Sequence, residues 1–315
     1  MLFKSDASHL EEGLFQKDFL IKNFNRLKIK IGDRVFHNTI IAQKGWFEYT
    51  GEGNLDDWQN LTGTRPSELQ QIEQKLAKLN QQLKQQGIPL VVVVAPNKAS
   101  IYPETIPPVI QKIAGPSRLD AFSQLMSQHP DIIYLDLRAT LLAAKHEQTL
   151  YYATDTHWNP HGAYAGYAAI LTRLAEIYPD LQPYRKKQFN IKEMPAAPKD
   201  LAQIMGAPFW VEPTLTVKPR LQVDVFSRTL STSSGFSITE SWSAPAPQDL
   251  TLLLYGDSFK YGMIPFLETH FKKSVFTSYH ETIHMAGITR YQPDIVILEV
   301  VERYLPILNS VLTEE

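Results

Sequence analysis

The chain has 315 residues, of which 43% are hydrophobic and 20% charged, so it holds ample apolar material for a large folded core. Its formal net charge is −2 with both signs interspersed, a balance that gives no indication of a nucleic-acid surface or a polybasic membrane patch. It has no cysteine, which excludes thiol catalysis, thiolate metal sites and disulfides.

Residues 1–60 are expected to form an N-terminal arm that packs on the rest of the chain. The start of the arm carries acids where a signal peptide has an apolar stretch. No later run approaches the roughly 18 apolar residues that a membrane span needs. The arm ends in "KGWFEYTGEGNLDDW", which is rich in aromatic and turn residues.

After the arm, apolar strands alternate with amphipathic helices. The helical pattern is clearest over 65–86, where apolar residues recur at steps of three and four and Gly87 ends the helix. Buried strands are predicted at 88–96, 249–257 and 293–301, with weaker candidates at 131–137 and 274–279. This order predicts an α/β fold, in which helices cover both faces of a parallel sheet.

Residues 183–248 interrupt this alternation. They are rich in proline and contain short alternating runs such as "LQVDVF", which predicts an irregular, partly β insertion between a helix and the next core strand. Such a segment can be functional or a mere spacer, and the pattern leaves both open. The expected organisation is the arm, followed by a main domain over 61–315 that contains the insertion.

The first candidate for chemistry lies after the strand at 249–257, because ligands of open α/β sheets bind beyond the carboxyl ends of the strands. Ser258 follows Gly256 and Asp257 there, before a helix expected from Lys260 to Phe271. Backbone N–H groups at such a strand-to-helix turn point at whatever the hydroxyl attacks. A serine hydroxyl is a poor nucleophile at neutral pH and needs a base that an acid holds in one tautomer.

The segment "YYATDTHWNPHGAYAGYAAIL" at 151–171 can supply both of these groups. Asp155 and His157 project to the same side of an extended segment, so one short loop can deliver the base and its orienting carboxylate. Asn159 is placed to cap the helix that Pro160 begins, which would fix the loop against the scaffold. Together with Ser258, these residues favour a serine-hydrolase-type site.

"GDSF" after a strand and "DTHW" before a helix resemble the blocks of the SGNH hydrolase superfamily, in the order found in the alginate O-acetyltransferase family (AlgX- and AlgJ-like, or DHHW, proteins). Further similar segments are "KGWFEYTGEGNLDDWQN", "VVVVAPNKASIYPE" and "PDIVILEVVERYL", so the resemblance covers most of the chain apart from 183–248. It implies an SGNH-like, flavodoxin-like sheet that is circularly permuted, because the Asp-x-His block precedes the serine.

Carried over to this chain, the resemblance implies Ser258 as nucleophile, His157 as general base and acid, and Asp155 as orienting carboxylate. The implied activity is that of a polysaccharide O-acetyltransferase with acetylesterase activity, which passes an acetyl group through an acetyl-serine to a secreted or cell-surface polysaccharide. The implied partner is a membrane-bound O-acyltransferase that supplies acetyl groups. The implied location is the periplasm or cell surface, with a signal or anchor before Met1, and the chain looks more like AlgJ than AlgX.

Other residues are expected to bind the oxyanion and the substrate. Glu302 and Arg303 stand where ordinary SGNH members carry Gly-x-Asn-Asp, so the donors are expected to be the Ser258 N–H and a group near Tyr279 or Arg303. Aromatic candidates for a sugar groove are Trp158 and Tyr261, followed by Phe259, Tyr279 and Trp46. Basic candidates for an anionic polymer are Lys98, Lys260 and Arg303.

Three other interpretations stay open. The chain could be a carbohydrate-binding or assembly protein with a degenerate SGNH fold. "HETIH" matches the pattern of zinc proteases through His280 and His284. However, the stretch between the strands predicted at 274–279 and 293–301 is short for the helix that this motif needs. His157 and His161 could also hold a metal with Asp155, although Pro160 disfavours a shared helix turn. The preferred interpretation needs no metal and no cofactor, and no nucleic-acid partner is expected.

Overall fold

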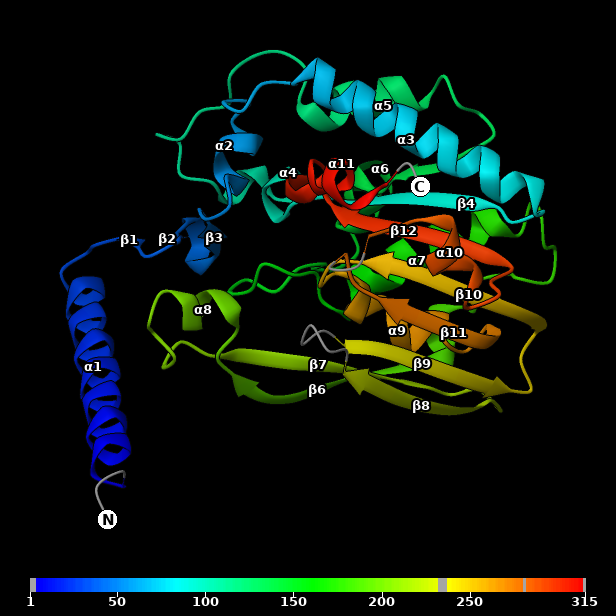
Figure 1. Ribbon diagram of the computed structural model, residues 1–315. Helices are drawn as coiled ribbons and strands as arrows, with labels where there is room; N and C mark the ends of the chain where they lie inside the picture. The colour runs from blue at the N-terminus through cyan, green and yellow to red at the C-terminus, as the bar shows by residue number, and fades with distance from the viewer. Residues whose placement is uncertain (1–3, 232–236, 280–281, 314–315) are drawn as a thin grey trace.

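The central element of the fold is a seven-stranded sheet, whose labelled strands from β4 to β8 lie one below another in Figure 1. The computed structural model describes residues 4–231, 237–279 and 282–313. In spatial order the strands are β5 (Ile133–Asp136), β4 (Leu90–Ala95), β12 (Ile295–Val301), β10 (Gln248–Gly256), β11 (Phe271–Thr277), β9 (Ser237–Ala244) and β8 (Asp224–Ser231). The first five are parallel, which confirms the predicted α/β fold and all five predicted core strands.

Helices cover both faces of this sheet. One face carries α3 (Pro66–Gln85), α5 (Arg118–Met126) and α11 (Ile307–Val311), and the other carries α6 (Arg138–Ala144), α7 (Pro160–Leu174) and α9 (Lys260–Leu267). In Figure 1, α3 and α5 lie side by side above the sheet. Alternate residues of β4 enter the two cores, which is why this strand is apolar at every position.

The segment predicted as an insertion is part of the sheet. It forms a two-stranded ribbon of β6 (Phe189–Ala197) and β7 (Glu212–Pro219), with α8 (Asp200–Ile204) between them, and then β8 and β9. β9 pairs antiparallel with β11 and β8 pairs with β9, so the segment extends the parallel sheet by two strands. The alternative of a mere spacer is therefore wrong.

The N-terminal region reaches the main body through several contacts. It contains α1 (Lys4–Lys30), the three-stranded sheet β1 (Val35–Phe36), β2 (Thr39–Ile41) and β3 (Phe47–Tyr49), and α2 (Asn54–Trp58). The Asn25 side chain donates to the Met205 carbonyl (2.6 Å), and Phe47 N–H donates to the Ala153 carbonyl (2.8 Å). The second bond joins β3 to the loop that carries Asp155.

Short helices complete the chain. They are α4 (Lys98–Ile101), α10 (Met285–Thr289) and 3-10 turns at Gln43–Gly45, Pro103–Thr105, Lys186–Gln188 and Glu302–Tyr304. Within the described residues, no helix is both long enough and apolar enough to cross a membrane.

The fold predicts a large loss of stability when an α3 side chain that packs on the sheet is shortened. The Leu76 side chain is fully buried there, so Leu76→Ala removes apolar contacts and leaves a cavity, at a cost of about 2–5 kcal/mol. The free energy of unfolding is measured by urea denaturation, with circular dichroism as the signal for unfolding. Leu61 is 55% exposed, and Leu61→Ala is the matched control, expected to change stability by no more than about 0.5 kcal/mol. Equal losses in both variants would contradict this packing.

Candidate active site

Ser258 lies in the turn between β10 and α9, at the carboxyl end of the sheet. The preceding Asp257 fixes this turn, because its carboxylate accepts hydrogen bonds from Phe259 N–H (2.9 Å) and from Val301 N–H at the end of β12 (2.6 Å). The turn is thereby tied to the neighbouring parallel strand. Ser258 is exposed in this turn.

His157 reaches Ser258 from a loop that lies 101 residues earlier in the chain. Its Nε2 lies 2.7 Å from Ser258 Oγ, and its Nδ1 lies 2.7 Å from an Asp155 carboxylate oxygen. The Asp155 carboxylate also accepts the His157 backbone N–H (3.0 Å). The three groups therefore form one chain of hydrogen bonds from carboxylate through imidazole to hydroxyl, the arrangement that activates a serine.

Local sequence explains how this loop is held. The Asn159 side chain accepts hydrogen bonds from His161 N–H (2.8 Å) and Gly162 N–H (3.3 Å) at the start of α7, and Pro160 occupies the first helical position. The predicted cap is confirmed. A helix start fixed at Pro160, three residues after His157, limits the positions that His157 can take.

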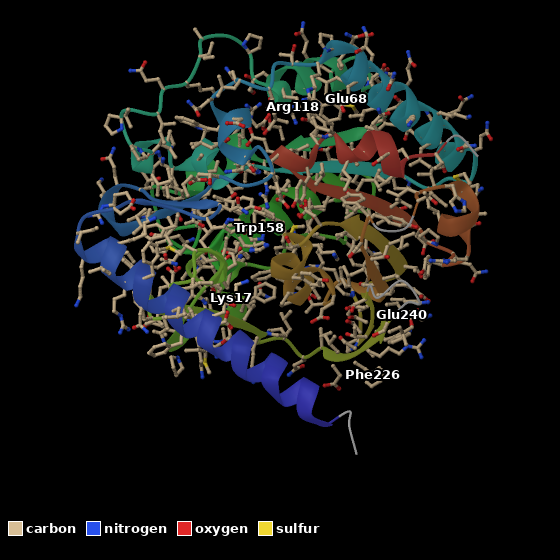
Figure 2. The ribbon with its side chains drawn as sticks, turned by 60° about the vertical axis from the view of Figure 1, so that its left-hand side comes forward. Lys17, Glu68, Arg118, Trp158, Phe226 and Glu240 are labelled. Atoms are coloured by element: carbon tan, nitrogen blue, oxygen red, sulfur yellow. The ribbon has the colours of Figure 1, made fainter. Side chains whose placement is uncertain are left out.

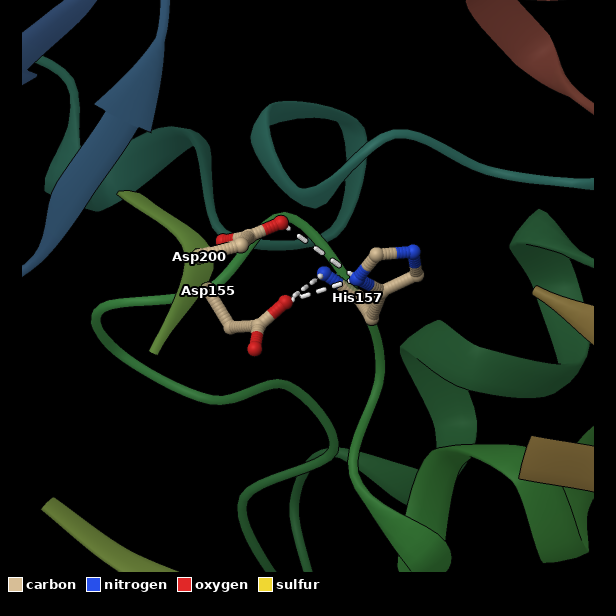
Figure 3. Close-up of side chains that lie close together, drawn as sticks. All are labelled: Asp155, His157 and Asp200. Atoms are coloured by element: carbon tan, nitrogen blue, oxygen red, sulfur yellow. Dashed lines mark hydrogen bonds and ion pairs between the residues drawn. The ribbon is translucent and has the colours of Figure 1, made fainter. Parts of the chain in front are cut away.

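A second carboxylate, absent from the sequence-based site, also approaches the imidazole. Asp200 of α8 places one oxygen 3.4 Å from His157 Nδ1 and accepts hydrogen bonds from both the backbone N–H and the hydroxyl of Thr156. Figure 3 shows Asp155 and Asp200 on the Nδ1 side of His157, leaving Nε2 directed away from both. The only local signal for Asp200 is a lone acid in a proline-rich segment, which does not reveal a partner more than forty residues away.

Lys98 and Glu212 also hold the backbone of the His157 loop in place. Lys98 Nζ donates to the Asp155 carbonyl (2.6 Å) and the Ala153 carbonyl (3.3 Å). Glu212 of β7 accepts from Ala153 N–H (3.0 Å) and Thr154 N–H (2.7 Å). The loop is thus clamped between the end of β4 and the ribbon of the inserted segment.

The two carboxylates set the charge of the imidazole. Burial disfavours the charged ring, but the hydrogen bonds to Asp155 and Asp200 outweigh burial and raise the pKa of His157 to about 9. Burial likewise opposes ionisation of Asp155, and its bonds with His157 nevertheless lower the pKa of that carboxyl. At neutral pH the resting site therefore holds an imidazolium flanked by two carboxylates, and the neutral base becomes more abundant as the pH rises toward 9.

Two predicted substrate contacts are structural instead. Trp158 and Phe259 are buried, and Trp158 Nε1 donates to the Phe259 carbonyl (3.1 Å). Figure 2 shows Trp158 in the interior of the molecule. The Phe259 ring packs against both Trp158 and His157, with 5.1 Å between ring centroids in each case. The prediction that these side chains contact sugar is wrong, because they join the two loops of the site.

The predicted basic side chains are also engaged within the protein. Lys98 is 3% exposed under the His157 loop, and Lys260 is 1% exposed. Lys260 Nζ lies 3.0 Å from each of three oxygens, the Gly256 and Asp257 carbonyls and Ser278 Oγ. Neither lysine is a surface charge for an anionic polymer. The Lys98 ammonium donates to two carbonyls of the His157 loop, and the Lys260 ammonium donates to two carbonyls at the end of β10 and to Ser278 Oγ.

Tyr279 and Arg303 are hydrogen-bonded to groups other than Ser258. The Tyr279 hydroxyl donates to the Glu299 carbonyl, so the expectation that it supplies an oxyanion donor is wrong for this side chain. Arg303 donates to Asn97 Oδ1 (3.3 Å), and its guanidinium lies 4.8 Å from the Tyr304 ring centroid and 5.8 Å from that of Phe259. Within the described residues neither side chain is hydrogen-bonded to Ser258.

The other predicted aromatic residues lie in two different environments. Tyr261 is 52% exposed beside Ser258, as a sugar-contacting residue would be. Trp46 packs on Tyr102, with 4.6 Å between ring centroids, and belongs to the edge of the core. Tyr261 is therefore the exposed aromatic candidate next to the serine.

The alternative metal sites depend on His280, His284 and His161. His280 lies outside the described residues. His284 precedes α10 and caps it, because its Nδ1 accepts the Gly287 N–H (3.2 Å), so it does not sit within the helix that a zinc protease motif requires. His161 is not part of the cluster around His157, whereas Asp155, His157 and Asp200 offer ligand atoms within 4.8 Å of one another. Both ring nitrogens of His157 already have partners there.

Residues 40–282, most of the chain, match the family described as "SGNH hydrolase-like domain, acetyltransferase AlgX". The chain belongs to this family. The resemblance found in the sequence is thus confirmed, and the ends of the match enclose Asp155, His157 and Ser258.

Individual relatives of this AlgX-family chain are distant. The alginate biosynthesis protein AlgX of Pseudomonas aeruginosa is 27% identical over 168 residues, which cover 50% of this chain and 32% of AlgX. The chain thus spans about a third of the length of that relative. Bacillus cereus PatB1 shares the fold with a TM-score of 0.64 at 16% identity, covering 88% of this chain and 97% of PatB1. The O-acetyltransferase domain of Pseudomonas putida AlgJ gives a TM-score of 0.57 at 17% identity, covering 85% and 92%.

The site predicts that Asp200→Asn lowers the pKa of His157. A neutral amide no longer stabilises the imidazolium, so the titration midpoint of the ring should move from about 9 to lower pH, by about one pH unit. Nuclear magnetic resonance titration of the ring protons measures this, with the His157 signal assigned by its loss in His157→Gln. Asp249, 77% exposed, provides the matched control Asp249→Asn, which should leave the midpoint unchanged. An unchanged midpoint in Asp200→Asn would refute the role of that carboxylate.

Proposed function

We propose that this chain is a serine-dependent O-acetyltransferase, with acetylesterase activity, that moves an acetyl group through an acetyl-Ser258 to a hydroxyl of a polysaccharide. The observation that carries the proposal is the 2.7 Å contact between His157 Nε2 and Ser258 Oγ, with Asp155 on the opposite ring nitrogen. Membership of the AlgX family supports the same reaction.

In the first step the Ser258 oxygen attacks the carbonyl carbon of an acetyl donor. The Ser258 proton passes to neutral His157 at Nε2, and the charge that forms on the ring is stabilised by Asp155 and Asp200. The tetrahedral intermediate collapses when the donor oxygen leaves and takes the proton back from His157. The product is acetyl-Ser258 and a neutral imidazole.

In the second step a sugar hydroxyl replaces the donor. His157 Nε2 accepts the proton of that hydroxyl as its oxygen attacks the acetyl carbon, and Ser258 Oγ leaves with the same proton. Water in place of the sugar gives acetylesterase activity by the same route. The balance between the two outcomes depends on how well the site holds an acceptor and keeps water away.

The backbone at Ser258 suits the charge that develops on the acetyl oxygen. Within the described part of the chain the Ser258 N–H has no hydrogen-bond acceptor, whereas the following N–H, of Phe259, is used by Asp257. An N–H that is held in place and unpaired is the group expected to stabilise an oxyanion.

The proposed cellular context follows from the family. The protein would act in the periplasm or at the cell surface, with a signal or anchor segment before Met1, and would receive acetyl groups from a membrane-bound O-acyltransferase. The Pseudomonas aeruginosa relative is named as an alginate biosynthesis protein, which favours a secreted polysaccharide as the acceptor class.

Two other functions are less well supported. A binding or assembly protein with a degenerate fold would have no need for a carboxylate, an imidazole and a serine in a continuous hydrogen-bonded row. A zinc protease would need His284 inside a helix that contains His280, whereas His284 lies before α10 and His280 is outside the described residues.

The proposed reaction predicts that Ser258→Ala abolishes turnover of p-nitrophenyl acetate, by a factor of roughly a thousand or more, because no acetyl-serine can form. Release of nitrophenol measures the rate, and mass spectrometry of the wild-type protein during turnover should detect acetylated Ser258. Ser127, exposed at the end of α5, provides the matched control Ser127→Ala, which should keep full activity.

Three outcomes separate the alternatives. Activity that survives Ser258→Ala and disappears with a chelator would replace this proposal by metal-dependent hydrolysis. Polysaccharide binding without any turnover in the wild-type protein would favour the binding or assembly function. Loss of turnover only in Ser258→Ala supports the acetyl-serine route.

A further inference from the structure

The side chain of Lys260, two residues after Ser258, folds back against the turn that carries the serine. Its Nζ lies 3.0 Å from the Gly256 carbonyl, from the Asp257 carbonyl and from Ser278 Oγ, and the residue is 1% exposed. A lysine is almost never buried so completely unless its charge is paired. The reaction steps proposed above do not use this side chain, so its burial beside the serine needs another explanation.

The Asp257 carbonyl belongs to the same peptide group as the Ser258 N–H. This peptide is trans and planar, so its carbonyl and its N–H point in opposite directions. The carbonyl oxygen accepts a hydrogen bond from Lys260 Nζ (3.0 Å) and is approached by the Lys260 backbone N–H (3.4 Å). Because the carbonyl is held at the buried ammonium, the Ser258 N–H is directed away from it.

The charge of the ammonium also affects the strength of this N–H. A hydrogen bond from a charged donor is stronger than a neutral one and polarises the group that accepts it. Polarisation draws electron density toward the carbonyl oxygen, so the N–H at the other end of the same amide becomes a better donor. The Ser258 N–H is the group expected to stabilise the charge on the acetyl oxygen.

A buried carboxyl lies next to the Lys260 side chain. Glu299 of β12 is fully buried, and a Cβ atom added to Gly256 would lie 2.6 Å from its Oε2 and 3.2 Å from Lys260 Cβ. Glu299 and Lys260 therefore both pack against the backbone of Gly256. Burial lowers the pKa of Lys260, whereas the carboxyls of Glu299 and Asp257 raise it. The two acids thus favour the charged ammonium inside the protein.

Lys260 also connects the serine turn to the sheet. Ser278 follows β11, so the third contact of the ammonium joins the turn to that strand. Asp257 makes the corresponding connection to β12 through the Val301 N–H. The turn is thereby fixed to both of the strands that flank β10, which limits rotation of the peptide before Ser258.

We infer that Lys260 is a positioning residue of the oxyanion site, whose buried ammonium holds the Asp257–Ser258 peptide so that the Ser258 N–H donates to the acetyl oxygen. This inference rests on the proposed function. Lys260 does not touch the acetyl group and exchanges no proton, because it acts through the backbone of Ser258. Its effect is largest where negative charge develops on the acetyl oxygen, so it favours the transition state more than the bound ester.

Lys260→Met tests this role, because methionine is similar in length and lacks the ammonium. We expect kcat for p-nitrophenyl acetate to fall at least about tenfold while KM changes less than about twofold, since loss of a whole oxyanion donor costs a factor of about 100 to 1,000. A residue that only stabilised the fold would leave kcat of the folded protein unchanged. Lys272 of β11, 62% exposed, provides the matched control Lys272→Met, which should keep both constants.

Infrared spectroscopy of the acetyl-enzyme reports on the hydrogen bond itself. The stretching frequency of the ester carbonyl falls when its oxygen accepts a hydrogen bond, and isotopic labelling of the carbonyl carbon in the donor separates this band from the protein background. We expect the band of acetyl-Ser258 at a higher frequency in Lys260→Met than in the wild-type protein and in Lys272→Met.

Removing Lys260 alone leaves a buried carboxyl without its cation, which can destabilise a protein strongly. The double variant Lys260→Met with Glu299→Gln removes the cation and the neighbouring carboxyl together, and it takes away the same contact to the Asp257 carbonyl. It should show the same loss of kcat and the same shift of the band. Circular dichroism establishes which variants are folded.

The outcomes distinguish this inference from the proposed function. Wild-type kcat and an unshifted band in a folded variant without Lys260 overturn the role of Lys260, while Ser258→Ala still abolishes turnover. A fall in kcat without a shift of the band overturns it as well, because the hydrogen bond to the acetyl oxygen is then unchanged. Nitrophenol release that does not depend on Ser258 contradicts the proposed function itself.

Discussion

The contact between the imidazole of His157 and the hydroxyl of Ser258 is the interaction on which the rest of the site depends. The two residues come from loops that no local structure joins, so the contact exists only because both loops are held at the carboxyl end of one parallel sheet. Asp257 ties the serine turn to β12, and Asn159 ties the histidine loop to α7. The hydrogen bond from Trp158 to the Phe259 carbonyl then links the two loops directly.

The charge around His157 comes from a balance between burial and two acids. One carboxylate would suffice to orient the ring, and the second, from Asp200, favours the imidazolium further. The benefit lies in the transition state, where the ring becomes charged, while the cost is that little neutral base exists at rest near pH 7.

The inserted segment and the N-terminal region complete a site that the sheet alone cannot build. The inserted segment supplies Asp200 and Glu212, which hold the histidine loop, and two strands that extend the sheet. The N-terminal region contacts the same loop through Phe47 and lies against Arg303 through Glu52. Two solved structures with TM-scores of 0.57 and 0.64 share the overall fold at sequence identities below 20%, since a fold depends on burial more than on particular side chains.

Sequence alone determined the elements whose signals are local. The strands at 88–96, 249–257 and 293–301 were predictable because a strand covered on both faces must be apolar throughout, and the Asn159–Pro160 helix start because capping involves adjacent residues. Ser258 was recognisable from its motif after a strand, and Asp155 and His157 were recognisable from their motif before a helix. The tertiary structure alone decided that Asp200 joins them, that Lys98 and Trp158 are buried, and that residues 183–248 extend the sheet. These facts depend on contacts between residues far apart in the chain, and periodicity carries no information about which distant groups will meet.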